Sequence, residues 1–166
     1  MIFIGFGYLF HCPHCGEATY LALGTGNEYT VQNVFYGNPA DPPLIKDFTT
    51  RQTYQKALEY LNQNGVPDTK LPGSYGHKIY YCPECRTLKV HFYFSIATEE
   101  KPWHPKYKCE LCKEQLILAP GQRPGDDPEK FKLIGEDREV LRIHCDKCGK
   151  IYFATESGCT SKIHWE

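Results

Sequence analysis

The sequence of 166 residues predicts a mainly β protein with one inserted helix, built around paired cysteines. Three observations indicate this fold class. Eight of the nine cysteines form four C-x-x-C pairs, each pair lies between two strand-like stretches, and one stretch between the first two pairs has helical periodicity. The four pairs are Cys12/Cys15, Cys82/Cys85, Cys109/Cys112 and Cys145/Cys148, which leaves Cys159 unpaired.

The expected strands are recognised by alternating apolar and polar residues on either side of each pair. The clearest is 88–97, in which Val90, Phe92 and Phe94 fall on one face. The opposite face carries Lys89, His91 and Tyr93, and we expect it to be solvated. Each pair would then occupy the tip of a β-hairpin. The predicted strands cover 6–10, 19–23, 78–81, 88–97, 107–108, 115–119, 140–143 and 151–155.

The long stretch between the first and second pairs predicts a helical insertion at about residues 24–77. Its helix is expected over 51–64, because apolar residues recur there at helical spacing, Thr49 or Thr50 can cap its start, and Gly65 can end it. Aromatic and β-branched residues at 29–36 predict a strand before that helix.

A linker is predicted at 99–105, where Pro102 and Pro105 flank Trp103. It divides the chain into two expected units: a first lobe with the helical insertion at 1–98, and a second lobe at 99–166. Each lobe alone would have only a small hydrophobic core, so bound metal would add to its stability.

Composition restricts the function classes. The formal net charge is −1, from 19 basic and 20 acidic side chains, so no global field attracts nucleic acid or an anionic membrane. No apolar run is long enough to span a bilayer, and residues 1–10 lack the features of a secretory signal. We therefore expect a cytoplasmic protein, whose reduced cysteines favour metal binding over disulfides.

Two residues between cysteines let both sulfurs face one ion from a tight turn, and two such turns complete a tetrahedron. Four thiolates suit Zn²⁺ or iron, and a complete four-cysteine shell leaves no open position for a substrate. The sequence therefore predicts two metal sites made from the eight paired cysteines, with two zinc ions expected and iron as the alternative metal. Two such zinc sites would move the net charge to about −5.

The turns resemble the knuckles of zinc ribbons and rubredoxin-like folds. Phe10-His11-Cys12-Pro13-His14-Cys15-Gly16 and Ile143-His144-Cys145-Asp146-Lys147-Cys148-Gly149 carry the glycine that these folds favour after the second cysteine. The other two pairs place Arg86 and Lys113 at that position. The resemblance implies tandem zinc-ribbon-like hairpins with structural metal. It implies no activity, because such knuckles serve many functions.

Which pairs share a metal is a separate question. The closure entropies of sequential pairing and nested pairing differ by under ~0.1 kcal/mol, so chain entropy favours neither. The first two pairs both read Cys-Pro-x-Cys, which favours sequential pairing, as does the tendency of neighbouring elements to pack together. The glycine after the second cysteine instead links the first pair with the fourth. We expect sequential pairing and keep the nested arrangement as the alternative.

These features predict a non-enzymatic, metal-binding module that docks a protein partner or nucleic acid. The segment 101–108 is the candidate contact surface, because basic and aromatic side chains alternate there. A Pro-stiffened linker whose Trp103 packs inward explains the same residues. The candidate contact residues are Lys101, Trp103, Lys106, Tyr107 and Lys108.

An alternative function is a thiol oxidoreductase or a rubredoxin-like electron carrier that uses Cys12/Cys15, because Cys-Pro-His-Cys resembles the dithiol of thioredoxin-fold oxidants. Those dithiols open a helix, whereas a strand is predicted after Gly16. No other catalytic motif is recognised in the sequence, so no catalytic residue is predicted.

Overall fold

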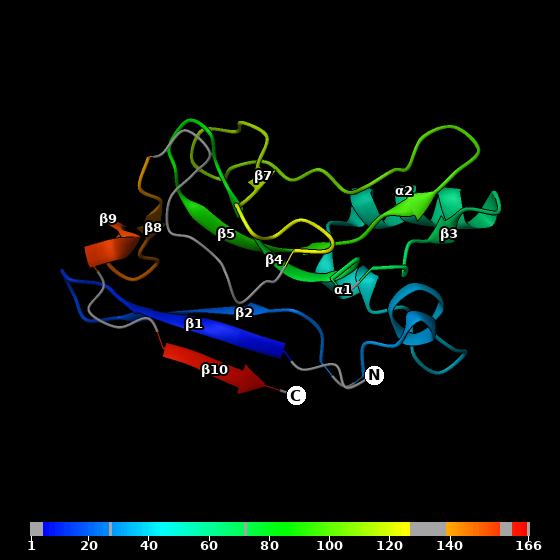
Figure 1. The fold of residues 1–166 in the computed structure, drawn as a ribbon, viewed down its shortest axis with the longest axis horizontal. Helices are drawn as coiled ribbons and strands as arrows, with labels where there is room; N and C mark the ends of the chain where they lie inside the picture. Colours follow the sequence, from blue (N-terminus) through cyan, green and yellow to red (C-terminus); the bar gives the residue numbers. More distant parts are fainter. Residues whose placement is uncertain (1–4, 27, 72, 127–138, 157–160, 166) are drawn as a thin grey trace.

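A computed structural model of the chain describes residues 5–26, 28–71, 73–126, 139–156 and 161–165. It confirms the predicted class, a mainly β protein of small antiparallel sheets, in which both α-helices of the described residues lie in one insertion. Figure 1 shows β1, β2 and β10 in one layer and β4 and β5 in another. The helices α1 and α2 lie at the end of the molecule opposite β8 and β9. No helix of the described ranges combines the length and apolarity needed to cross a membrane.

The first sheet has the order β10-β1-β2. Strands β1 (Gly5–His11) and β2 (Ala18–Leu23) form the predicted hairpin around the first cysteine pair. Strand β10 (Ser161–Trp165) pairs antiparallel with β1 and was not predicted from the sequence. Cys159 lies outside the described residues.

The second sheet has the order β5-β4-β7, and it joins distant parts of the chain. Strands β4 (Gly76–Tyr81) and β5 (Leu88–Tyr93) form the hairpin of the second pair, and β7 (Ile117–Leu118) joins the other edge of β4. Strand β7 belongs to the expected second lobe and β4 to the first. The division into 1–98 and 99–166 stays a prediction.

The fourth cysteine pair lies in the hairpin of β8 (Arg142–His144) and β9 (Ile151–Phe153), which is followed by a 3-10 turn, Ala154–Glu156. This hairpin packs on the two larger sheets. Their shared core is the largest cluster of buried side chains in the described structure, and it includes Phe10, Leu23, Ile79, Tyr81, Leu141, Ile143 and Tyr152.

The predicted strand 88–97 is wrong beyond residue 93. Strand β5 ends at Tyr93, and β6 (Ile96–Ala97) leaves the sheet to pair with β3 (Val66–Pro67). The carbonyl of Ser95 accepts a hydrogen bond from the backbone N–H of Asp68 at 2.8 Å, which draws the chain toward this second partner.

The predicted strand 29–36 is also wrong, because Gln32–Tyr36 forms a π-helix. The Thr30 carbonyl accepts from the N–H of Val34 at 2.9 Å, and the left-handed Gly37 closes the turn by donating to Gln32 at 2.7 Å. Adjacent Val34 and Phe35 are both buried, which a helical turn allows and an alternating strand does not.

Helix α1 (Ile45–Phe48) precedes the predicted amphipathic helix, α2 (Arg51–Asn62). The Thr50 hydroxyl accepts a hydrogen bond from the N–H of Thr53 at 3.2 Å, which confirms Thr50 as the cap of α2. A second core joins the insertion to the segment 92–96, and it contains Val34, Phe35, Ile45, Ala57, Phe92, Phe94 and Ile96.

Candidate metal centres

The eight paired cysteines meet in two groups of four. Within each group the sulfur atoms all lie within 4.8 Å of one another. The outer cysteine group is Cys12, Cys15, Cys145 and Cys148, and the inner cysteine group is Cys82, Cys85, Cys109 and Cys112. The expected sequential pairing is therefore wrong, and the pairing is nested.

Packing behind the turns explains the nested arrangement. The β1–β2 and β8–β9 hairpins share the largest core, where Phe10 and Leu21 meet Ile143 and Tyr152, so their tips come together. The inner group forms because β7 pairs with β4, and because Tyr80 and Tyr107 share a third core cluster with Cys82, Cys109 and Leu116.

Each cysteine turn has the same backbone geometry. The residue after the second cysteine has a positive φ, and its N–H donates to the carbonyl of the first cysteine at 2.8 to 3.0 Å. The N–H of the first cysteine in turn donates to the carbonyl of the residue that follows this left-handed residue, at 2.8 to 3.1 Å. The left-handed residues are Gly16 (φ 78°) and Gly149 (φ 73°) in the outer group, and Arg86 (φ 65°) and Lys113 (φ 66°) in the inner group.

The sulfur spacing fits a tetrahedral ion. In the outer group, Cys12 Sγ lies 3.7 Å from Cys148 Sγ, and Cys15 Sγ lies 3.6 Å from Cys145 Sγ. The corresponding distances in the inner group are 3.3 Å for Cys82 to Cys112 and 3.5 Å for Cys85 to Cys109. Four sulfurs around Zn²⁺ lie roughly 3.8 Å apart, whereas disulfide-bonded sulfurs lie ~2.05 Å apart. Each group could therefore hold one metal ion.

The first cysteine of every pair is buried, and the second is more exposed. Burial opposes ionisation of Cys12, but the N–H groups of His14 and Cys15 and the Cys148 thiol outweigh it and lower the pKa to about 7. For Cys15, the N–H of Glu17 favours the thiolate, yet burial and the neighbouring thiols raise the pKa to about 12.

The inner group has the same asymmetry. Burial and the Cys112 thiol raise the pKa of Cys82 to about 12. Burial also opposes ionisation of Cys109, but the N–H groups of Cys112 and Leu111 prevail and lower the pKa of Cys109 to about 6. Without metal, each group therefore combines a thiol that ionises near neutral pH with one that keeps its proton.

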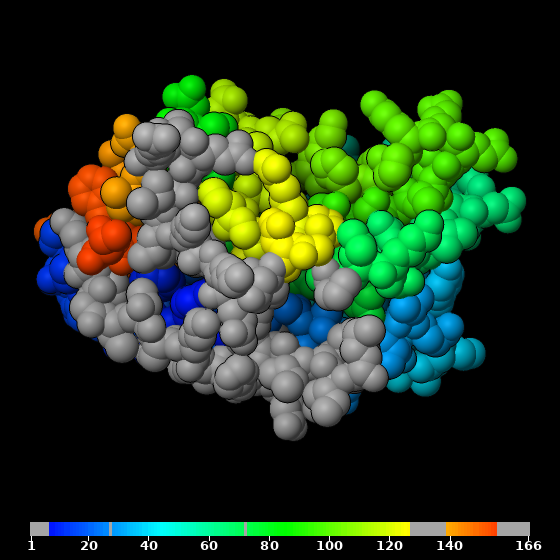
Figure 2. Space-filling view, in the orientation of Figure 1, coloured from blue at the N-terminus to red at the C-terminus, as the bar shows by residue number. Residues whose placement is uncertain are grey.

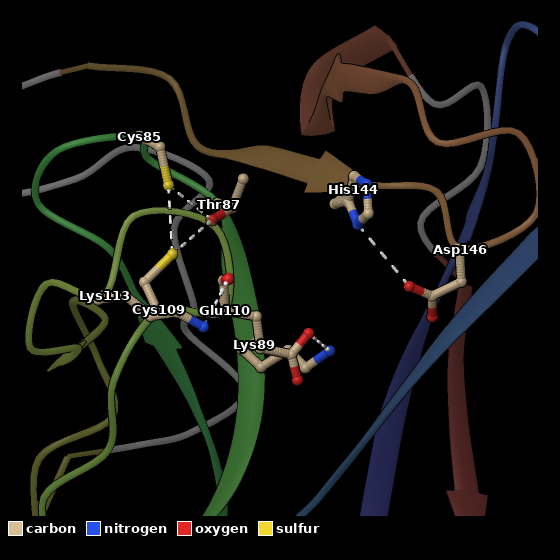
Figure 3. Close-up of polar contacts among 8 residues, drawn as sticks. All are labelled: Cys85, Thr87, Lys89, Cys109, Glu110, Lys113, His144 and Asp146. Carbon is tan, nitrogen blue, oxygen red and sulfur yellow. Dashed lines mark hydrogen bonds and ion pairs between the residues drawn. The ribbon is translucent and has the colours of Figure 1, made fainter.

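Thr87 is a site residue that the sequence analysis missed. Its side chain is buried beside the inner group, and its hydroxyl lies 3.0 Å from Cys85 Sγ and 3.9 Å from Cys109 Sγ. It can donate to either sulfur once that sulfur is a thiolate. Its place in the sequence, two residues after the second cysteine of the pair, is the signal from which this role could have been predicted. Figure 3 shows Thr87 beside the sulfurs of Cys85 and Cys109, with His144 and Asp146 on a neighbouring segment.

A cleft of about 240 Å³ lies beside the inner group, and Cys109 is the cysteine that lines it. Thr87 and Cys109 line one side, and Ile143 and His144 line the other. An ion pair lies at its edge, with Lys89 Nζ 3.4 Å from Glu110 Oε2, and His144 Nδ1 lies 3.8 Å from Asp146 Oδ1.

The structure places the candidate contact residues of 101–108 in two environments. Lys101, Lys106 and Lys108 are exposed. Trp103 packs between Tyr60 and Phe94, with ring centroids 5.3 and 5.7 Å away, and its backbone pairs with Ile96. Tyr107 is buried and donates its hydroxyl to the Phe92 carbonyl. The three lysines of this segment are therefore exposed, whereas the Tyr107 ring that was expected to accompany them is buried.

Comparison with protein families, curated proteins and solved structures finds no significant match to this chain.

Proposed function

We propose that the protein is a non-enzymatic binding module in which each cysteine group holds one Zn²⁺. The observation that supports this proposal is the fourfold set of sulfurs in each group, which fills every position of a tetrahedral ion. A metal with a complete protein shell has no position for a substrate, so its role is to hold hairpins together. Unpaired thiols suit a reducing compartment, and we expect the cytoplasm.

A protein partner is favoured over nucleic acid. Two zinc sites would leave the chain at about −5, which opposes general attraction to phosphates. The Tyr107 ring is stacked on His91 inside the protein, with centroids 4.2 Å apart, and so does not offer a face to a nucleotide base. Beside the cleft, Tyr20 and Leu111 are 43% and 47% exposed, which suits an apolar contact with another protein.

Native mass spectrometry of the full chain tests the metal assignment. We expect two Zn²⁺ per chain and a colourless protein. A red protein containing iron, or one metal with a reactive dithiol at Cys12 and Cys15, would instead support the electron carrier or thiol oxidoreductase.

Fluorescence anisotropy with labelled single-stranded and duplex oligonucleotides tests the choice of partner. We expect no saturable binding at low salt. Binding that weakens in a Lys106→Ala, Lys108→Ala variant would make nucleic acid the partner.

A further inference from the structure

The two cysteine groups differ in how far their turns are exposed. In the outer group both turns are exposed along their whole length, at residues 13–18 and 146–150. In the inner group the turn at 110–115 is exposed, whereas residues 85–87 are half-buried or buried. Figure 2 shows atoms of the β1–β2 and β8–β9 hairpins, in blue and orange, at the left end of the molecule. A dissolved oxidant therefore has access to both turns of the outer group but to one turn of the inner group.

In the outer group, each exposed sulfur lies beside a buried sulfur of the other hairpin. Cys15 and Cys148 are exposed, whereas Cys12 and Cys145 are buried. The Sγ atoms of Cys15 and Cys145 are 3.6 Å apart. Those of Cys12 and Cys148 are 3.7 Å apart. A disulfide needs a separation of ~2.05 Å, so a movement of about 1.6 Å would join either pair.

Thr87 gives the inner group a hydroxyl that has no counterpart in the turns of the outer group. Its Oγ1 atom lies 3.0 Å from Sγ of the half-buried Cys85, which leaves Cys112 as the one exposed cysteine of the inner group. The equivalent positions in the outer group are Glu17 and Lys150, which are exposed and carry no hydroxyl. Because a hydrogen bond to a thiolate stabilises its charge, the Cys85 thiolate should attack an electrophile more slowly.

We propose that the outer group is a redox-sensitive site, which hydrogen peroxide oxidises to two disulfides between the hairpins with release of its Zn²⁺, before the inner group loses its metal. This inference rests on the proposed function, because it requires one Zn²⁺ in each group. The thiolate is the form of cysteine that reacts with peroxide, and exposure decides which thiolates are reached. The outer group has two exposed thiolates and the inner group has one.

Each disulfide consumes one molecule of hydrogen peroxide. The Cys15 thiolate attacks one peroxide oxygen, the O–O bond breaks, and hydroxide leaves as a sulfenic acid forms. The Cys145 thiolate then attacks the sulfenic sulfur, which forms the S–S bond and expels a second hydroxide. Two protons from solvent convert both hydroxides to water, so two thiolates have given two electrons to one peroxide. Cys12 and Cys148 react in the same way with a second peroxide, and the Zn²⁺ leaves because no thiolate holds it.

Disulfides between the hairpins would replace the metal as the link between the two ends of the chain. The shared core behind the turns, which includes Phe10 and Ile143, does not contain the exposed sulfurs and stays packed. Oxidation therefore changes the outer turns and leaves the fold intact. A reductant that returns the four thiols lets Zn²⁺ bind again.

Native mass spectrometry of the zinc-loaded full chain during exposure to hydrogen peroxide tests the order of release. We expect two Zn²⁺ at the start, and loss of the first at least about fivefold faster than loss of the second. The species with one Zn²⁺ is denatured, alkylated and mapped by peptide mass spectrometry. Its disulfides should be Cys15–Cys145 and Cys12–Cys148, and reduction with added zinc should restore two Zn²⁺. Cys159→Ser, which removes the ninth cysteine, should give the same result.

Thr87 variants test why the inner group reacts more slowly. Thr87→Val should speed the oxidation of the Cys85 thiol about threefold, because the donor to its sulfur is lost. Thr87→Ser keeps the hydroxyl and should match the parent protein. The rate of loss of the Cys15 thiol should be the same in all three proteins. Peptide mapping follows the thiols themselves, so a weaker affinity for zinc in the valine variant is not mistaken for oxidation.

Three results would overturn the inference. The first is loss of both Zn²⁺ at one rate. The second is a disulfide of the inner group in the species that has lost one Zn²⁺. The third is a Cys12–Cys15 disulfide in place of the two disulfides between the hairpins. A chain that binds fewer than two Zn²⁺ before any oxidant is added would instead overturn the proposed function, and the inference with it.

Discussion

The hydroxyl of Thr87 lies 3.0 Å from the sulfur of Cys85 in the inner group, and the backbone of the same residue pairs with the β8–β9 hairpin that carries Cys145 and Cys148. Thr87 also pairs through its backbone with Arg142 in a parallel bridge, where the N–H of Arg142 donates to the Arg86 carbonyl at 2.8 Å. The strand that begins at Arg142 leads directly to Cys145 of the outer group. One residue therefore contacts a sulfur of one group and the strand that leads to the other.

Replacing Thr87 by valine should weaken zinc binding by the inner group about tenfold, because a donor to its thiolates is lost. The outer group should keep its affinity, since the backbone bridge to Arg142 does not need the side chain. Competition with a chromophoric chelator measures both affinities. Thr87→Ser, which keeps the hydroxyl, should behave like the parent protein, and equal losses in both variants would contradict the assigned role.

Cysteine variants made in pairs test the nested arrangement. Cys12→Ser combined with Cys145→Ser should remove one zinc and leave the other, because both residues belong to the outer group. Cys12→Ser combined with Cys82→Ser should disrupt both sites. Native mass spectrometry counts the metals. Sequential pairing predicts the reverse, so the two double variants discriminate between the arrangements directly.

Zinc binding should release protons. At pH 8 Cys15 and Cys82 retain their protons in the metal-free protein, because the pKa of each is raised to about 12. Each must lose its proton to bind metal, so at least one proton should leave per zinc, and affinity should fall at least tenfold per unit as pH is lowered. Calorimetry in buffers of different ionisation enthalpy measures the release. Heats that do not depend on the buffer would contradict this expectation.

Substituting Gly16 should destabilise the protein through its backbone alone. Its φ is +78°, and a Cβ placed there would meet nothing within 4 Å. Gly16→Ala should therefore lower the free energy of unfolding by ~1–2 kcal/mol, the cost of a side chain in the left-handed region. Gly16→Asn should lose less, because asparagine tolerates this conformation. Denaturation of the zinc-loaded variants measures both. Equal losses would instead indicate a steric origin.

Acid should destabilise the fold through buried histidines. Burial lowers the pKa of His77 to about 4, and burial together with the nearby Lys89 lowers that of His91 to about 4. The unfolded chain binds these protons near pH 6.5, so the stabilisation is present above pH 6.5 and is lost as pH falls toward 4.

The acid effect is at most ~1.4 kcal/mol per pH unit for each histidine. His91→Gln should reduce the pH dependence of the unfolding free energy in this range by about one proton. Comparison with the parent protein cancels the common contribution of metal release. NMR titration of the His77 ring should show no protonation above about pH 5, and titration near pH 6.5 would contradict its burial.

The sequence predicted that the eight cysteines cluster, that the first, second and fourth pairs lie in β-hairpins, and that α2 is a capped helix, because each depends on local spacing and local capping. The hairpin predicted around the third pair is wrong, since only an isolated bridge joins Lys108 to Gln115 and β7 pairs with β4 instead. The sequence did not predict the pairing, because the two closure entropies are nearly equal and the two local cues conflict. The glycine cue was the correct one, since Gly16 and Gly149 lie in the same group, whereas the shared Cys-Pro-x-Cys pattern joined pairs that lie in different groups.

The remaining differences arise from contacts distant in sequence. Gln32–Tyr36 has strand propensity but forms a π-helix, in which both Val34 and Phe35 are buried against the insertion core. Tyr107 alternates with lysines as a nucleic-acid-binding residue would, yet it is buried, with its ring stacked on His91 and its hydroxyl donating to the Phe92 carbonyl. Neither placement can be read from neighbouring residues.

The nested arrangement also imposes an order on biosynthesis. The inner group has all its ligands once the ribosome has released Cys112, whereas the outer group must wait for Cys148. At a translation rate of about 5–20 residues per second, the delay is roughly 2–7 s. During that interval Cys12 and Cys15 have left the ribosome without their partners, so the earliest cysteines to be made are the last to be protected from oxidation.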